Sequence, residues 1–191
     1  MRASNEDKQK SRARILQAAS RRFREHGIAA SGLADIMKDA GLTHGGFYKH
    51  FPDKESLVRA ALAEGFGEVL ATLGDGQGDG GFRMRYLSPE HRDARGIGCP
   101  VAALGGEIAR TDEATRRVMA DGVEALIALL QGEQEGVSPP RGDVIRQIAE
   151  MVGAVVVARA VEGPLSDEIL AAVRRDGRQD RPEAERHGGT A

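Results

Sequence analysis

Apolar residues recur three and four positions apart along the chain, the spacing that places them on one face of a helix. In the first such stretch Ile15, Ala19 and Phe23 stand four apart, and Gly27 follows at its end. No strand-like alternation of any length occurs. The pattern therefore predicts an all-α fold.

Three more helices are predicted before the first glycine-rich segment. Ser31 is placed to cap a short helix that Gly41 closes. Thr43 is placed to cap the next helix, which runs to about Phe51. Asp53 is placed to cap a long fourth helix. Three short helices followed by one long helix are thus expected in the first third of the chain.

The glycine-rich segment over residues 74–81 is predicted to be a flexible break. Beyond it we expect a helix from Pro100 and further helices over residues 112–135, 142–162 and 166–175. The polar tail from residue 176 is expected to be disordered.

The predicted helix over residues 142–162 is apolar on two sides. A helix of this kind must be buried on both. One side can pack within its own domain, and the other is expected to meet a second subunit. The first side carries Val144, Ile148, Met151 and Val155, and the second carries Ile145, Val152, Val156 and Ala160.

The charge of the chain is unevenly distributed. Residues 1–54 carry a net charge of +5 and the remainder −7, for a total of −2. Because residues 1–54 are basic and the rest of the chain is acidic, a polyanionic partner is suggested for residues 1–54. No run of about 18 apolar residues and no secretory signal are present, and Cys99 is the single cysteine. These features predict a cytoplasmic protein without a membrane span.

Two short helices joined by a tight turn at residues 40–43 indicate a helix-turn-helix, whose recognition helix enters the DNA major groove. In that helix Gly45 and Gly46 together cost about 2 kcal/mol of helix propensity. The cost is better tolerated where backbone must come close to a partner such as a phosphate. Phe47 and Phe51, four apart, are expected to face inward.

Residues 11–60 resemble the DNA-binding signature of the tetracycline-repressor (TetR) family. The resemblance rests on Gly27-Ile28, Ser31, Asp35-Ile36, Ala40-Gly41-Leu42-Thr43, Gly45, Phe47-Tyr48, His50-Phe51, Lys54-Glu55 and Leu57. Gly46 replaces the larger residue common at its position. The resemblance implies that Thr43 caps the recognition helix and touches the DNA backbone, that His44, Gly45 and Gly46 lie at bases, that Tyr48, His50 and Lys54 hold phosphates, and that Lys49 holds a base or a phosphate.

The same resemblance implies a domain organisation and partners. Residues 1–56 would form the helix-turn-helix domain, and residues 57–175 a helical regulatory and dimerisation domain. The protein would bind a palindromic operator in double-stranded DNA as a homodimer and be released by a small-molecule inducer. Neither a cofactor nor a metal is expected. Candidate pocket residues are Phe66, Phe82, Tyr86, Met119, Val123 and Met151, with plain core packing as the alternative for each.

Cys99 is a further candidate because it precedes Pro100 and should occupy a helix N-cap, where the dipole favours a thiolate. The setting resembles a TetR branch that includes electrophile and oxidant sensors, so release by modification of Cys99 is one alternative. A small buried side chain is the other. Outside transcription, a helical enzyme and a protein-interaction module remain open. The enzyme is disfavoured because the chain has no phosphate loop, dinucleotide fingerprint or nucleophile elbow.

Overall fold

The computed structural model describes residues 5–74, 79–132 and 138–175. The regular elements within these ranges are all helices, which confirms the all-α prediction. They are α1 (Asn5–His26), α2 (Leu33–Asp39), the 3-10 helix η1 (His44–Lys49), α3 (Lys54–Gly74), α4 (Asp79–Tyr86), α5 (Pro89–Asp93), the 3-10 helix η2 (Arg95–Ile97), α6 (Pro100–Ile108), α7 (Glu113–Gly132), α8 (Arg141–Ala160) and α9 (Pro164–Arg174).

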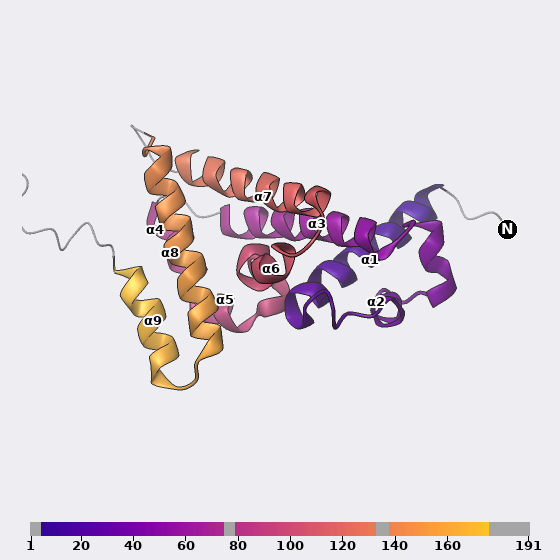
Figure 1. The fold of residues 1–191 in the computed structure, drawn as a ribbon, viewed down its shortest axis with the longest axis horizontal. Coiled ribbons are helices and arrows are strands. Elements are labelled where there is room, and N and C mark those ends of the chain that lie inside the picture. The colour runs from indigo at the N-terminus through magenta and orange to yellow at the C-terminus, as the bar shows by residue number, and fades with distance from the viewer. Residues whose placement is uncertain (1–4, 75–78, 133–137, 176–191) are drawn as a thin grey trace, which may run out of the picture.

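The molecule is elongated (Figure 1). Helices α1, α2 and η1, which we call the N-terminal head (residues 5–51), lie at one end, and α8 and α9 lie at the other. The long helices α3 and α7 run side by side between them, with α6 beneath. We call residues 54–175 the body. The predicted tail, residues 176–191, lies outside the described residues.

Glycines end two helices of the head as predicted. Gly27 follows α1 with φ +85°, and Gly41 follows α2 with φ +67°. After α2 the N–H of Gly41 donates to the carbonyl of Lys38, and the N–H of Leu42 donates to that of Met37, at 2.9 and 2.8 Å. This pair of bonds closes the helix, and its left-handed residue is the reason that glycine stands there.

Of the predicted N-caps, Asp53 is confirmed and Ser31 is wrong. The Oδ1 atom of Asp53 accepts the N–H of Ser56 at 2.7 Å, and this bonding lowers the pKa of Asp53. Ser31 is buried, and its hydroxyl donates to the carbonyl of Gly27 at 2.6 Å, so Gly32 becomes the N-cap of α2. The hydroxyl therefore joins the start of α2 to the end of α1.

The recognition helix also differs from the prediction. Thr43 occupies its N-cap position, but the side chain makes no capping hydrogen bond. Residues 44–49 form a 3-10 helix in place of an α-helix. The low helix propensity of Gly45 and Gly46 gives the physical reason, since a 3-10 turn needs fewer consecutive helical residues.

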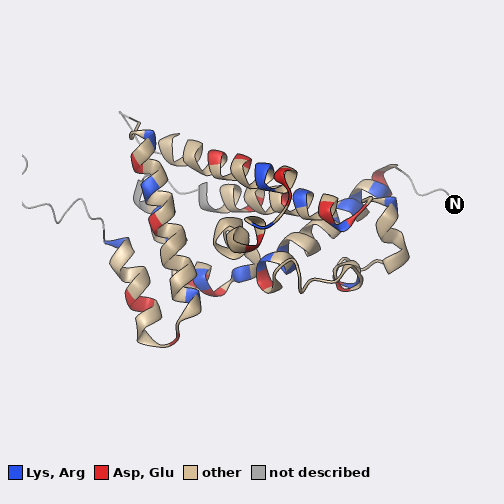
Figure 2. Ribbon diagram, viewed as in Figure 1, with Lys and Arg blue, Asp and Glu red and all other residues tan. Residues whose placement is uncertain are grey.

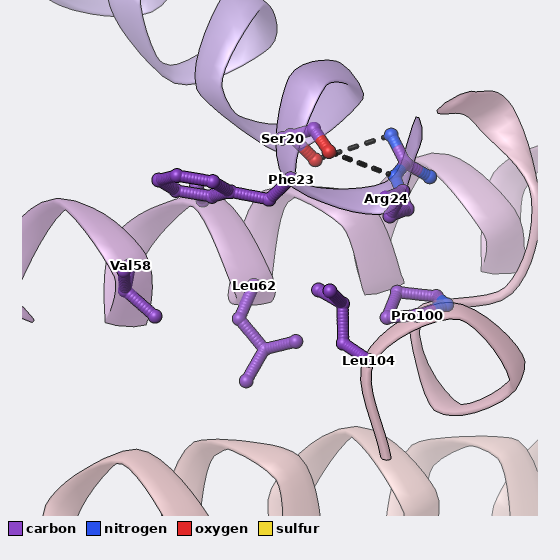
Figure 3. A pocket seen from close by; sticks show the side chains of 8 residues that line it. Ser20, Phe23, Arg24, Val58, Leu62, Pro100 and Leu104 are labelled. Carbon is purple, nitrogen blue, oxygen red and sulfur yellow. Dashed lines mark hydrogen bonds between the residues drawn. The ribbon is translucent and has the colours of Figure 1, made fainter. Parts of the chain in front are cut away.

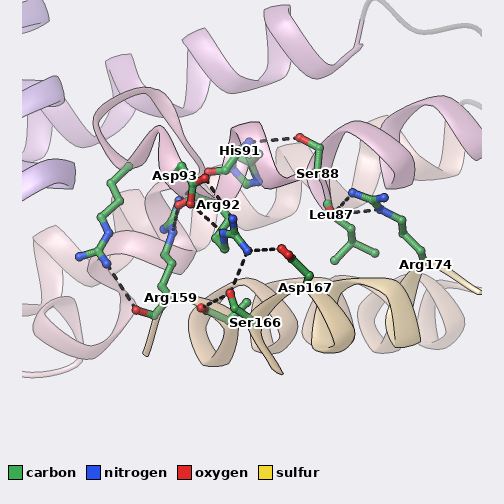
Figure 4. Close-up of polar contacts among 11 residues, drawn as sticks. Leu87, Ser88, His91, Arg92, Asp93, Arg159, Ser166, Asp167 and Arg174 are labelled. Atoms are coloured by element: carbon green, nitrogen blue, oxygen red, sulfur yellow. Dashed lines mark hydrogen bonds and ion pairs between the residues drawn. The ribbon is translucent and has the colours of Figure 1, made fainter. Parts of the chain in front are cut away.

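Both ends of the predicted glycine-rich break are helical, because α3 extends to Gly74 and α4 begins at Asp79. Residues 75–78 lie outside the described residues. From here α4 and α5 are held against α8 and α9 by arginines (Figure 4). Arg159 donates to the carbonyls of His91 and Arg92 at 2.9 Å each, and Arg174 donates to that of Leu87 at 2.6 and 3.1 Å. These carbonyls lie at the C-terminal ends of α4 and α5, where they lack helical partners.

Candidate nucleic-acid interface

The candidate DNA-contacting residues of η1 lie together on its outer surface. Tyr48 is 66% exposed, and His44, Gly45 and Lys49 are exposed with it. Beneath them Phe47 is buried. One short element therefore presents a phenol, an ammonium, an imidazole and bare backbone toward solvent.

Buried aromatic packing fixes the orientation of η1. The rings of Phe47 and Phe51 stack with centroids 5.9 Å apart, and the Tyr48 ring meets Phe47 edge-on at 5.1 Å. This confirms the inward side predicted for the two phenylalanines. A Cβ atom added at Gly45 would meet no atom within 4 Å. The backbone at this position is thus open to close approach by a partner.

The basic surface is wider than the sequence analysis predicted. Burial and the positive charges of Lys8, Arg12 and Lys49 lower the pKa of the half-buried His50. The Arg12 guanidinium lies 4.8 Å from the centre of the Phe51 ring. Cations from the first turns of α1 therefore lie beside η1, and Figure 2 shows the Lys and Arg positions along α1. The basic composition of residues 1–54 was the only sequence signal for this contribution.

Lys54 has an internal partner. Its Nζ atom donates to the carbonyl of Ile28 at 2.7 Å, and the side chain is half-buried at the start of α3. The bond joins α3 to the turn between α1 and α2. An ammonium carries three donors, so a phosphate contact is compatible with this bond and stays a prediction.

Ion pairs hold α2 against α1. The guanidinium of Arg22 lies 2.7 Å from the carboxylate of Asp39 and 3.3 Å from that of Asp35. Both carboxylates come from α2. Since the turn at Gly41 fixes η1 relative to α2, this pair of contacts also fixes η1 relative to α1.

Arg24 connects the head to the body from a buried position. Its guanidinium donates to the hydroxyl of Ser20, to the carbonyl of Gly98 at 3.0 Å and to the carboxylate of Glu68. Here α1 meets α3 and α6 around a tightly packed pocket that leaves no room for a water molecule (Figure 3). It is lined by Ser20, Phe23, Arg24, Val58, Ala61, Leu62, Pro100 and Leu104.

The predicted ligand-pocket residues lie elsewhere, in the body. Four of them are buried, and Met119 and Val123 are half-buried. Phe82 and Tyr86 stack at 5.7 Å, and Phe66 packs so closely on Gly122 that a Cβ there would lie 2.3 Å from its ring. None of the six lines the pocket of Figure 3. In this conformation the buried members act as core, and their contact with a ligand stays a prediction.

Cys99 is the N-cap of α6, as predicted, and it is fully buried. Its backbone N–H donates to Nε2 of His91 at 2.9 Å, and Nδ1 of His91 lies 2.6 Å from the carbonyl of Tyr86. His91 is therefore neutral with its proton on Nδ1. Burial lowers its pKa, and the nearby Arg159 adds to the effect. Of the two alternatives for Cys99, a reactive thiol or a small buried side chain, its burial favours the second.

Within the described ranges, no group of three His, Cys, Asp or Glu residues is arranged to hold a metal ion. No helix there is long and apolar enough to cross a membrane.

Comparison with known proteins identifies the head first. Residues 15–61 match the family model of bacterial regulatory proteins, tetR family. The HTH-type transcriptional regulator TtgR of Pseudomonas putida is 45% identical over 62 residues, 32% of this chain and 30% of TtgR. The head therefore carries the DNA-binding domain that this tetR-family model describes. The chain spans less than a third of the length of the first curated relatives that it matches.

Solved structures extend the likeness to the body, at the level of the fold. Reduced E. coli NemR aligns with a TM-score of 0.68 and 22% identity over 85% of this chain and 94% of NemR. A tetR-family regulator from Agrobacterium tumefaciens aligns with a TM-score of 0.68 and 21% identity over 87% of this chain and 97% of its own. Head and body therefore share the architecture of these regulators.

Proposed function

We propose that this chain is a tetR-family, ligand- or stress-responsive transcription regulator, most simply a repressor, that binds a palindromic operator as a homodimer. One observation carries the proposal above the others. Helix η1 presents exposed polar side chains and the open backbone of Gly45 on a rigid aromatic base beside cations of α1. Positive charge beside a rigid, shaped element suits a nucleic-acid backbone.

The residues of η1 divide into two roles in this proposal. Tyr48, Lys49 and His50 donate hydrogen bonds to phosphates, and Lys49 also has the reach to contact a base. The exposed His44 and the backbone at Gly45 and Gly46 face the base edges, with Thr43 at the entrance to the helix. In the free protein, burial and the neighbouring cations lower the pKa of His50. Phosphate contacts set affinity and register, while base contacts set sequence preference.

The second apolar side of α8 supports the dimer. Between Glu150 and Arg159 the helix carries no charged residue, as its tan ribbon in Figure 2 shows. Its outer side chains are exposed in the single chain, which is unusual for a contiguous apolar stripe on a monomer. The exposed members are Ile145 at 47%, Val156 at 44% and Val157 at 49%, and Leu165 of α9 adds 52%. A symmetric partner would bury this stripe.

Release follows a population shift in this proposal: an inducer binds the conformation in which the two heads are wrongly spaced for the operator. A reversible apolar inducer is preferred to modification of Cys99, because that thiol is fully buried. A genomic DNA partner places the protein in the cytoplasm. Binding, and not catalysis, is the activity proposed.

Enrichment of duplex DNA tests the function. The full-length protein is incubated with a pool of random-sequence duplexes, and bound duplexes are amplified and footprinted. Two half-sites whose centres lie one helical turn or a multiple of it apart are expected. Tyr48→Ala should weaken binding about tenfold on every enriched duplex, and His44→Ala should change the preferred bases. Met84→Ala, another exposed large side chain, is the control. Failure to enrich any duplex, with binding to acidic proteins instead, would favour an interaction module.

A further inference from the structure

Glu107 occupies an electrostatically unfavourable place in α6. It lies in the last turn of the helix, where the dipole is negative. Its Oε2 atom accepts the backbone N–H of Ile28 at 3.0 Å and lies 3.3 Å from the N–H of Ala29, which it also accepts. Both amides belong to the turn between α1 and α2, nearly eighty residues earlier in the chain. The two charge-assisted bonds offset the helix-end penalty.

The turn between α1 and α2 is shaped to receive an anion. Gly27 has φ +85°, and the amides that follow it point to one place, which is the geometry of a backbone nest. A Cβ atom at Gly27 would lie 2.6 Å from Oε1 of Glu107. Glycine is therefore required here both for its left-handed backbone and for the close approach of the carboxylate.

The same turn is tied to the start of α3 on its other side. The carbonyl of Ile28 accepts the Nζ donor of Lys54, at 2.7 Å. Lys54 is the first residue of α3, directly after the segment that follows η1. Hydrogen bonds thus connect α6 through the turn to the start of α3, the helix that follows the candidate DNA-contacting element.

We propose that Glu107 is a positioning residue that fixes the N-terminal head to α6 and so transmits the position of α6 to the DNA-binding surface; the inference rests on the proposed function. Without the carboxylate, the amides of Ile28 and Ala29 lose their partner and the turn is released from α6, while Lys54 still holds it to α3. The head then samples several orientations, and the apparent affinity for an operator falls by the fraction that remains competent.

Four full-length proteins test the proposal: wild type, Glu107→Ala, Glu107→Gln and Glu113→Ala. Glu113 is an exposed glutamate at the start of α7 whose carboxylate pairs with Arg117 four residues on, and it serves as the matched control. The first measurement is amide hydrogen exchange at Ile28 and Ala29. The second is the dissociation constant for the duplex that the wild type enriches from a random pool.

Exchange at both amides should be about tenfold faster in Glu107→Ala than in the wild type, and operator affinity about tenfold weaker. Glu107→Gln should be intermediate in both, because its amide oxygen still accepts a hydrogen bond. It also carries the test if the alanine variant does not fold. Glu113→Ala should match the wild type in both measurements.

If hydrogen exchange at Ile28 and Ala29 is unchanged in the Glu107 variants, the proposal that Glu107 holds the turn is wrong. Faster exchange with operator affinity within about twofold of wild type would overturn the positioning role, leaving a local structural bond. If the wild type enriches no duplex, the proposed function fails, and the exchange data alone decide whether Glu107 holds the turn.

Discussion

The head and the body place their chemistry in opposite ways. In the head, most candidate DNA-contacting groups lie within residues 43–50, and Thr43, His44, Gly45, Tyr48 and Lys49 are exposed. In the body, several arginines reach backbone carbonyls across long sequence distances, as Arg159 does to His91 and Arg174 to Leu87. A surface that contacts a polymer with a repeating backbone can be formed by residues that lie close together in the sequence. The contacts of the body depend on how distant segments pack together, and a short sequence motif does not predict them.

The largest effect is expected when a substitution in the body changes DNA binding by the head. Val156→Glu places a charge in the proposed subunit interface while leaving η1 untouched. Monomers are expected in sedimentation velocity, with operator affinity at least about 100-fold weaker because the two heads are no longer linked. Ala128→Glu, on the exposed side of α7, is the control. A folded Val156→Glu protein that remains a dimer would place the interface elsewhere.

Two helical glycines of the body sharpen the comparison within one region. Gly122→Ala drives a methyl group into the Phe66 ring, so the free energy of unfolding should fall by about 2 kcal/mol. Gly67→Ala, whose added methyl group would meet no other described part of the chain within 4 Å, should raise it by about 0.5–1 kcal/mol through helix propensity. Urea denaturation measures both. Equal effects of the two substitutions would show that the close contact with Phe66 is relieved at no cost.

In the head, Arg12→Ala should leave the fold intact and weaken operator binding about fivefold, with the logarithmic salt slope reduced by about one. The reason is that Arg12 lies among the cations around His50. Arg117→Ala, in an exposed pair on α7, should change neither quantity. Titration of a labelled operator at several salt concentrations gives both numbers. A slope unchanged by Arg12→Ala would remove α1 from the interface.

The smallest expected effect concerns His91. Its folded-state pKa lies below the ordinary value of 6.5, so the unfolded chain binds protons first as the pH falls. The free energy of unfolding should therefore decrease from pH 7 toward pH 5. His91→Gln should show a smaller decrease, whereas the exposed His44→Gln should follow the wild type. Denaturation curves at four pH values check this, and equal slopes for wild type and His91→Gln would count against it.

Local chemistry explains which features could be predicted from sequence. The turns at Gly27 and Gly41 and the cap at Asp53 depend on residues within four positions, and all three are confirmed. The hydroxyl of Ser31 was assigned to the wrong partner because its acceptor, the carbonyl of Gly27, comes near only after the turn has folded.

The basic contribution of α1 was missed for a related reason. Lys8 and Arg12 precede η1 by more than thirty residues, and they reach it because α1 packs back over Phe51. The internal bond of Lys54 to Ile28 likewise joins residues 26 apart. The sequence pattern predicts which face of a helix is apolar, but it does not predict which distant polar group that face will meet.

The 3-10 geometry of η1 has a consequence for engineering. With three residues per turn, side chains three apart stand almost directly over one another, about 6 Å apart along the axis. Gly45 is therefore aligned with the exposed Tyr48 along the helix. A side chain at position 45 would have open space around its first carbon. A library that varies position 45 alone would add a new side chain in line with Tyr48 without touching the aromatic base beneath it. Altered operator preference could then be selected one residue at a time.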